Sequence, residues 1–590
     1  MRVNISREAQ QKIGKAELTI ITERVDDVAL LIGQMIKMGY PDILDKHIPK
    51  QGKQRELSWG WTATIWLGYI LSEGDHRKVS MVQYIEGMRN SLRAITEQAV
   101  EVLDFDDDRL SHLLKHLSKQ KIWQAIENDL NKRTIDIYEL STEVIRCDPT
   151  TVSGHHDIRE GGLMQYGHSK DDPRLPQVKL AVASLEPLGM PLASEAVAGE
   201  TADDGLYLGL IKRVDSSLNK AELLFVGDCK MSARENRMQI VAASHCYLSP
   251  LPLTGNTAQE MPDWIHKGLK KASTGELTPI FRENERGETV LAACAYEFER
   301  QQSVQKEDGE ISWLERVLMV CSPTHQEQQV KSLEQRLAKA LEKLAALTPQ
   351  VGRGKRQITD EESLQSQIEQ IIKAQRVQGL LHIEYKRQSE TQTRYIGKGR
   401  GSSNREQRII EKVRYQITAL KRDENAIETA KQQFGWKAFV TNASKEALSL
   451  KDAVLCYRNE YRIERIFNRL KSRLHIAPLF VKRDDQIEGM TYLLMLGVRV
   501  LTLLEFVIRR SLQADNAKLA ELHPQNRQKE TVKPTAERIL KAFSGITLTL
   551  IQDASGKKLL HHLSTLSSLQ QTIMVRLGLD NIYAQLQISG

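Results

Sequence analysis

Apolar residues recur at three- and four-residue intervals through the first part of the chain, which is the spacing of amphipathic helices. The clearest runs lie at residues 28–38, 59–71, 110–117 and 122–130. Polar positions between these runs face solvent if each run packs one side on a common core. The pattern therefore predicts a helical N-terminal domain over residues 1–140.

The pattern changes at about residue 141, where short apolar runs replace the helical period. A strand over 144–147 is expected to end at Asp148, and a buried strand over 223–227 leads directly into Asp228. Between and after them we expect two further strands and two helices, at 178–185, 191–195, 202–213 and 233–244. Strands and helices in this order predict an α/β fold, with a mixed sheet flanked by helices, beginning at 141–254.

Residues 255–440 interrupt this sheet as a large insertion. They contain strand-like runs, a long helical run and a basic glycine-rich loop, at 290–298, 313–320, 326–347 and 397–403. The core is expected to resume over 441–511, and 512–590 forms a C-terminal tail of unknown role. Within the core, the apolar run 490–508 includes Arg499 and Glu505, so we interpret it as a buried helix and not as a membrane span.

A helix over 457–474 would carry three different faces. Ile463 and Phe467 begin an apolar stripe, because residues three and four apart share a helix face. Glu464 lies on a second face with Tyr457 and Lys471. The third face gathers arginines with no acid among them, namely Arg458, Arg462, Arg465, Arg469 and Arg473. A solvated helix normally mixes its charges, so this face indicates a polyanionic partner, although a basic outer face is the plain alternative.

Composition indicates the cellular compartment and the charge of the binding partner. The formal charge of +7 is modest for 590 residues, but eight Lys or Arg and two Glu lie within 458–483. Basic residues concentrated in the second half are typical of a surface that binds nucleic acid. The six scattered cysteines form no Cys-x-x-Cys pair, which favours a reducing compartment. With no apolar leader at the N-terminus, we expect a cytoplasmic, nucleoid-associated protein.

Three acids lie where an α/β sheet would present chemistry. Asp148 and Asp228 follow predicted strands, and Glu464 lies on the later helix. Carboxylates alone suit Mg²⁺, or Mn²⁺ in its place, better than zinc. Two such ions can promote phosphoryl transfer. Taken singly, Asp148 could start a turn and Asp228 could cap a helix.

These residues resemble those of the DDE transposases of bacterial insertion sequences. The closer likeness is to the branch with an insertion before the glutamate and the signature Tyr-x2-Arg-x3-Glu-x6-Lys. Tyr457, Glu464 and Lys471 match it, whereas Glu460 stands at the arginine position. The segments 105–110, 147–151, 166–184 and 223–231 match further blocks of that family in the same order. Lys230 stands near the place where relatives commonly have an arginine.

The resemblance implies an RNase H-like catalytic core that binds two Mg²⁺ ions through Asp148, Asp228 and Glu464. It implies hydrolysis at terminal inverted repeats, followed by strand transfer of the freed 3′-OH into target DNA. Tyr457 and Lys471 would contact phosphates of the transferred end. It also implies that the N-terminal helices recognise the repeat and that a homodimer forms the synaptic complex, with no membrane involved.

Two alternatives remain open at this point. An RNase H-like nuclease would cut DNA without joining strands. A DNA-binding protein derived from a transposase could have lost catalysis, but such a protein has no use for three intact carboxylates. Physical reasoning alone adds that transfer chemistry needs the DNA backbone charge to be neutralised. The arginine face and Lys230 are the residues we expect to do so.

Overall fold

A computed structural model describes residues 18–50, 57–284, 287–306, 309–396, 406–523, 525–555 and 558–588. The basic glycine-rich loop expected at 397–403 lies outside the described residues. The chain divides into two compact units. The first comprises residues 1–249, 302–313 and 456–590, and the second comprises 250–301 and 314–455. The insertion expected over 255–440 corresponds approximately to this second unit.

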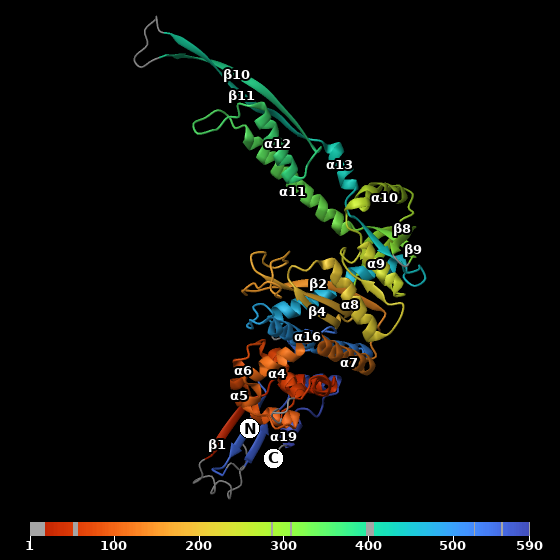
Figure 1. The fold of residues 1–590 in the computed structure, drawn as a ribbon, viewed down its shortest axis with the longest axis vertical. Helices are drawn as coiled ribbons and strands as arrows, with labels where there is room; N and C mark the ends of the chain where they lie inside the picture. The colour runs from red at the N-terminus through yellow and green to blue at the C-terminus, as the bar shows by residue number, and fades with distance from the viewer. Residues whose placement is uncertain are drawn as a thin grey trace. The chain divides into compact units, whose positions relative to one another are not determined.

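The N-terminal part of the first unit is helical, as the periodicity predicts (Figure 1). Its helices are α2 (Val28–Lys37), α3 (Tyr40–His47), α4 (Trp59–Glu73), α5 (Ser80–Thr96), α6 (Asp107–Leu117) and α7 (Gln120–Tyr138). The acidic turn before α6 supplies Asp106, which accepts a hydrogen bond from the Arg109 amide and caps that helix. A short helix of 3₁₀ type, η1 (Val102–Phe105), precedes this turn.

The mixed sheet of the first unit has the order β4-β3-β2-β5-β6. Its strands are β2 (Val144–Ser153), β3 (Gln177–Leu185), β4 (Met190–Ala198), β5 (Leu224–Val226) and β6 (Cys246–Pro250). β3 is antiparallel to β2 and β4, whereas β5 is parallel to β2 and β6. The connections contain α8 (Asp203–Leu218) and α9 (Arg234–Ala242). This arrangement confirms the predicted α/β fold with an RNase H-like mixed sheet.

One predicted boundary in this sheet is wrong. β2 does not end at Asp148 but continues through Pro149 to Ser153, paired with β3 along its whole length. On its other side, β2 pairs with β5 only as far as Arg146. Proline lacks an amide hydrogen and is tolerated where a strand has an open edge, so the strand can pass through Pro149.

The long apolar helix α16 (Asp484–Ala514) packs against α4, α6 and β4 in the first unit. It is the one described helix long and apolar enough to cross a membrane, yet 94% of its apolar window is buried within the protein. Arg499 donates to the Asn131 side chain at 2.7 Å, and Glu505 binds arginines. The prediction of a buried core helix over 490–508 is confirmed.

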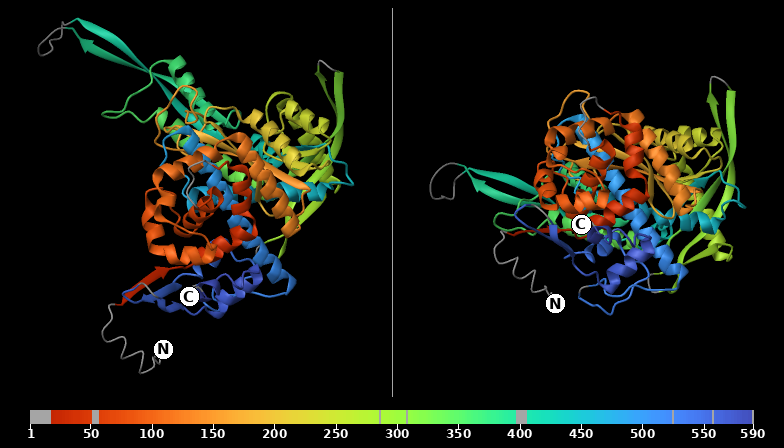
Figure 2. Two further views of the ribbon diagram at one scale, coloured as in Figure 1. Left: turned by 60° about the horizontal axis from the view of Figure 1, so that its bottom comes forward. Right: turned by 90° about the horizontal axis from the view of Figure 1, so that it is seen from below.

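The C-terminal residues complete the first unit. Strand β1 (Thr19–Arg24) pairs with β13 (Thr547–Gln552), which pairs with β14 (Lys558–Leu563), so segments from both ends of the chain form one sheet (Figure 2). The strand expected at 546–551 is therefore confirmed. The remaining helices of this region are α17 (Ala536–Lys541), α18 (Ser568–Leu577) and α19 (Gln585–Ile588). α18 packs on α16.

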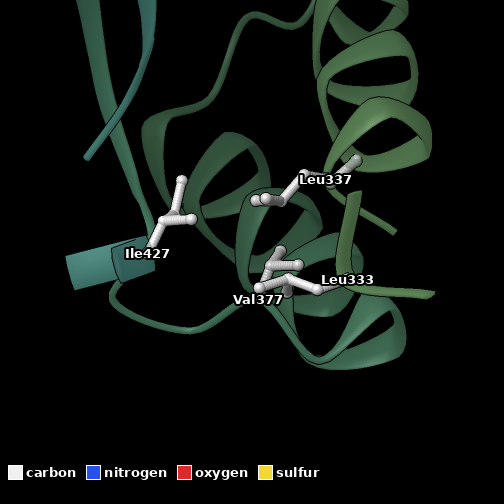
Figure 3. Close-up of a cluster of buried hydrophobic side chains, with 5 residues drawn as sticks. Leu333, Leu337, Val377 and Ile427 are labelled. Atoms are coloured by element: carbon white, nitrogen blue, oxygen red, sulfur yellow. The ribbon is translucent and has the colours of Figure 1, made fainter. Parts of the chain in front are cut away.

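The second unit combines a sheet, of order β12-β9-β8-β7, with a long two-stranded ribbon. The sheet strands are β7 (Thr278–Glu283), β8 (Thr289–Lys306), β9 (Gly309–Cys321) and β12 (Trp436–Thr441), and α10 (Gly255–Ser273) precedes them. The ribbon strands are β10 (Leu381–Tyr395) and β11 (Gln407–Arg422), and the neighbouring helices are α11 (Pro323–Leu347), α12 (Glu361–Gln375) and α13 (Glu424–Gln432). Leu333, Leu337, Val377 and Ile427 bury together where these helices meet (Figure 3).

Candidate active site

The register of two parallel strands brings Asp148 and Asp228 to the same level. β2 and β5 pair from Val144 opposite Leu224 to Arg146 opposite Val226. Asp148 and Asp228 each follow the last of these pairs by two residues. Asp148 therefore lies within a strand and starts no turn. The residue at the N-cap position of α9 is Ala233 and not Asp228. The alternative interpretations of the two aspartates, as a turn residue and a helix cap, are therefore wrong. Both residues lie at the same end of the paired strands.

Glu464 reaches this end of the sheet from a helical segment that follows the second unit. The expected helix over 457–474 is made of α14 (Leu450–Tyr457), the 3₁₀ turn η2 (Arg458–Glu460), α15 (Tyr461–Asn468) and the π-type turn η3 (Arg469–Arg473). Helix α15 packs against β2 and buries Ile463, Ile466 and Phe467. Glu464 is exposed on the same helix. The apolar stripe is confirmed for 463 and 467, but the uninterrupted helix is not.

A buried ion network fixes this helical segment to β2. Arg146 is 2% exposed, and its Nε donates to Glu186 at 2.7 Å. Its Nη2 donates to the Cys456 carbonyl at 2.6 Å, at the end of α14. Glu186 also accepts from Arg462 of α15 at 3.0 Å. Arg146 lies two residues before Asp148, so one network positions the strand of Asp148 and the helix of Glu464.

The electrostatics of Asp148 show that the acids lie near one another. The pKa of Asp148 is raised to about 7, chiefly by burial, and the carboxylates of Asp228, Glu460 and Glu464 contribute in the same direction. The Lys170 ammonium, 3.9 Å from Asp148 Oδ1, acts in the opposite direction. Of the two glutamates, Glu460 acts more strongly than Glu464. The Glu460 carboxylate, which the predicted triad did not include, therefore also acts on Asp148.

Asp228 is held by two donors. Tyr207 of α8, which is fully buried, donates its hydroxyl to Asp228 Oδ1 at 2.6 Å. The Lys230 amide donates to the same oxygen at 2.8 Å. Burial, together with the Asp228 carboxylate, raises the pKa of Tyr207, so the hydroxyl keeps its proton and acts as a donor. One carboxylate oxygen is thereby oriented, and Oδ2 is left for another ligand.

The donor set of the site suits a hard divalent cation. Asp148, Asp228, Glu460 and Glu464 offer carboxylate oxygens, and a bound cation would favour the ionised form of Asp148, which burial and the nearby carboxylates disfavour. In the described part of the chain, however, no three His, Cys, Asp or Glu residues stand close enough together to hold a metal ion. The residue types fit the metal, and the side chains must converge to bind it.

The arginines of the expected basic face have partners from distant segments. Arg462 binds Glu186, and both Arg465 and Arg469 bind Glu505 of α16 at 2.5 Å. Glu505 also binds Arg509 at 2.6 Å, and Arg469 reaches Glu537 at 3.2 Å. These three arginines therefore neutralise carboxylates within the protein. These ion pairs were hidden from the sequence pattern because their acids lie on distant segments and not on the arginine face itself.

The remaining residues expected to bind DNA have different surroundings. Lys471 Nζ pairs with Asp171 Oδ1 at 2.8 Å. Tyr457 is half-buried, with the Arg146 guanidinium 6.0 Å from its ring centre. Burial raises the pKa of Tyr457, with Glu460 and Asp228 adding to the effect. Arg458 lies in η2, and the Lys230 side chain is exposed beside Asp228.

Sequence reasoning missed four residues of this site. Arg146 and Tyr207 act through buried hydrogen bonds, Lys170 stands beside Asp148, and the Glu460 carboxylate contributes to the raised pKa of Asp148. A signal was available for Arg146, because a charged residue inside the apolar run 144–147 needs a partner when buried. Glu460 stood out as a departure from the signature, but its position gave no indication that it acts on Asp148.

The comparisons with known proteins place most of the chain in one family. The model of the transposase DDE domain matches residues 140–500, a range that contains Asp148, Asp228 and Glu464. No curated protein matches the chain. Among solved structures, it is similar to a piggyBac transposase synaptic complex with hairpin DNA, at a TM-score of 0.30 and 7% identity, covering 87% of this chain and 77% of that one. A likeness of this size assigns no role to any residue.

Proposed function

Because the chain belongs to the transposase DDE domain family, we propose that it moves a bacterial insertion sequence by cut-and-paste DNA transposition. The observation that carries this proposal is the common level of Asp148 and Asp228 on neighbouring parallel strands, with the helix of Glu464 packed on one of them. A protein that only binds DNA would not require Asp148 to be buried near other carboxylates, which is the environment that raises its pKa.

The chemistry proposed is two successive displacements at phosphorus. In the first, a water oxygen bonds to the phosphorus at the transposon end, and the bond to the 3′ oxygen breaks to leave a 3′-OH. In the second, that 3′-OH attacks a target phosphodiester, and the target's own 3′ oxygen leaves as a new 3′-OH. The proton lost by each nucleophile balances the proton gained by each leaving oxygen.

In this proposal Asp148, Asp228 and Glu464 hold Mg²⁺, or Mn²⁺ in its place, which supplies charge stabilisation at the reacting phosphate when bound. Tyr207 orients Asp228, and the Arg146–Glu186–Arg462 network holds the Glu464 helix against β2. Lys471, Tyr457 and Lys230 would contact the DNA backbone beside the metal. Arg462, Arg465 and Arg469 hold the segment in place through their internal ion pairs.

The partners proposed are the terminal inverted repeats of the element and the target DNA, bound by a homodimer in the cytoplasm. A nuclease that does not join strands, and a silent DNA-binding relative, are the alternatives. Both have measurable consequences, because the first yields cut ends without joint products and the second binds ends without cutting.

The test is Mg²⁺-dependent cleavage of the element's terminal DNA by the full chain, compared among wild type, Glu464→Gln and Glu200→Gln. Glu200 is exposed in the same unit and lies outside β2, β5 and the helix of Glu464. We expect wild type and Glu200→Gln to cut and Glu464→Gln to bind without cutting. A labelled target plasmid then detects joining. Binding without cutting by all three proteins would contradict the proposal and support the silent relative.

A further inference from the structure

The two faces of the β10–β11 ribbon differ in chemistry. Residues directly opposite one another in an antiparallel pair share a face, and alternate positions belong to the other face. Tyr385 is opposite Ile417, and Tyr415 is opposite Arg387. Tyr385, Tyr415 and Ile417 pack against Leu344, Leu364 and Ile368 of the two helices α11 and α12. This face is therefore covered by its own unit near the base of the ribbon, whereas farther out, from Arg387 and Glu411 onward, it is exposed like the opposite face.

The opposite face is strongly basic. It is formed by the five pairs Lys386–Gln416, Gln388–Arg414, Glu390–Lys412, Gln392–Ile410 and Arg394–Arg408. We call this surface the basic ribbon face. Its cations are Lys386, Arg394, Arg408, Lys412 and Arg414, against the single acid Glu390. At about 3.4 Å per residue, the positions from 386 to 394 extend over roughly 27 Å.

The cations of the basic ribbon face lack the partners that cations elsewhere in the unit have. Arg387, on the other face, pairs with Glu411 at 3.0 Å, and Arg422 pairs with Glu334 at 2.8 Å. Among the described residues, none of the five cations of the basic ribbon face forms an ion pair. Arg394 lies directly opposite Arg408, and like charges opposed across strands destabilise a sheet. An external anion would remove that cost.

We infer that the basic ribbon face binds duplex DNA in its major groove. A two-stranded ribbon fits that groove, which is about 12 Å wide, and the phosphates on both sides complement the five cations. The glutamines between the cations are among the residues that read base edges. Gln388 donates to Gln416 at 2.9 Å, which holds two side-chain amides on this face. The inference rests on the proposed function, because it assigns part of the DNA binding to the second unit.

The test compares two triple variants of the full chain that lose the same charge. Arg408→Gln, Lys412→Gln and Arg414→Gln together neutralise one strand of the basic ribbon face. The control combines Lys331→Gln, Lys339→Gln and Lys343→Gln, which are exposed on α11 in the same unit. Binding to the element's terminal duplex is measured without divalent metal over a range of salt. Circular dichroism melting establishes that both variants are folded.

We expect the ribbon variant to weaken duplex binding and to lower the salt dependence of log K by up to about 2.7, at about 0.9 for each of three lost phosphate contacts. The control should change little. Equal weakening by both variants would reduce the effect to net charge and overturn the inference, as would no effect from the ribbon variant. The same loss on duplex RNA, whose major groove is too narrow to admit side chains, would overturn the groove assignment.

This outcome is separable from that of the proposed function. Binding is measured without metal, so it does not depend on catalysis. If wild type cuts terminal DNA while the ribbon variant binds normally, the transposase proposal stands and the ribbon inference fails. If the ribbon variant loses duplex binding while wild type does not cut or join, the ribbon inference stands and the catalytic proposal fails.

Discussion

The Lys471 ammonium lies 2.8 Å from the Asp171 carboxylate, and the neighbouring Lys170 places its own ammonium 3.9 Å from Asp148. One segment between β2 and β3 thus puts an anion on a residue expected to bind DNA phosphate. It also puts a cation on a carboxylate expected to bind metal. Asp171 carries the same negative charge as the DNA phosphate expected at Lys471, and Lys170 carries the same positive charge as the metal expected at Asp148. DNA and metal must therefore displace these two contacts.

Asp171→Asn should therefore strengthen binding of the terminal DNA by a few-fold. Lys471 is freed from an ion pair that is partly exposed, and such pairs contribute about 0.2–1 kcal/mol. The matched control is Asp172→Asn, which removes the same charge at the adjacent residue but releases Arg174 instead of Lys471. Equal gains in the two variants, measured by anisotropy of a labelled end, would mean that only net charge matters.

The pKa of Asp148 gives a prediction for stability against pH. Its pKa is about 7 in the folded protein, against 3.8 as its ordinary value, so the folded state binds the proton more tightly than the unfolded state. Without metal, the free energy of unfolding should fall as pH rises from about 4 to about 7. Asp148→Asn should lose part of this fall, as measured by urea denaturation at several pH values.

The comparison with the variant is needed because other acids contribute in the same direction. Burial also raises the pKa of Asp27 to about 6 and of Glu127 to about 7. Both remain in Asp148→Asn, so the difference between the two proteins isolates Asp148. Added Mg²⁺ should stabilise wild type more at pH 8 than at pH 5.5, since bound metal requires the ionised carboxylate. Identical pH profiles for the two proteins would contradict the assignment.

Tyr207→Phe should raise the Mg²⁺ concentration needed for half-maximal cleavage by about tenfold, because groups that orient metal ligands typically affect affinity by 10–100-fold. The hydroxyl holds Asp228 Oδ1 at 2.6 Å. Tyr247→Phe is the control, since that buried hydroxyl accepts from Trp313 at 2.9 Å instead. A loss of rate that saturating Mg²⁺ does not restore would argue against a positioning role for Tyr207.

Glu505→Gln should destabilise the first unit by about 3–5 kcal/mol, the usual cost of leaving buried charges without their partner. The Glu505 carboxylate binds Arg465, Arg469 and Arg509, and its side chain is only 5% exposed. Glu530→Gln, which removes a surface pair with Lys518 at 3.8 Å, should change stability little. Thermal melting of the two variants checks both expectations, and equal melting temperatures would show that the buried pairs add nothing.

Local patterns predicted the elements well, because apolar spacing reports directly on which side of a helix or strand is buried. The order of strands and helices around Asp148 and Asp228 followed from such spacing, and the structure confirms it. The end of β2 was misplaced because Pro149 is a strand breaker only when both edges of its strand are paired. That condition depends on β5, which lies far along the chain.

The ion-pair partners of charged side chains are what the sequence predicted least well. The arginines at 462, 465 and 469 appeared unpaired because Glu186 and Glu505 are remote in sequence. The interruptions at 458–460 and 469–473 also depend on packing, since a helical period continues through a 3₁₀ or π turn without a mark in the sequence. The roles of the site residues themselves stay predictions, to be decided by the variants above.

The order in which the chain is made has a consequence for when it can act. Asp148 and Asp228 leave the ribosome before the second unit, and the Glu460 and Glu464 carboxylates leave it only afterwards. Synthesis proceeds from the N-terminus, and early segments can fold while later ones are still being made. A nascent or prematurely terminated product can thus carry the N-terminal helices and both aspartates without the glutamates. Such a fragment would also lack α16 and β13, on which the N-terminal helices and β1 pack, so the complete site and the complete first unit form only once the last residues have been made.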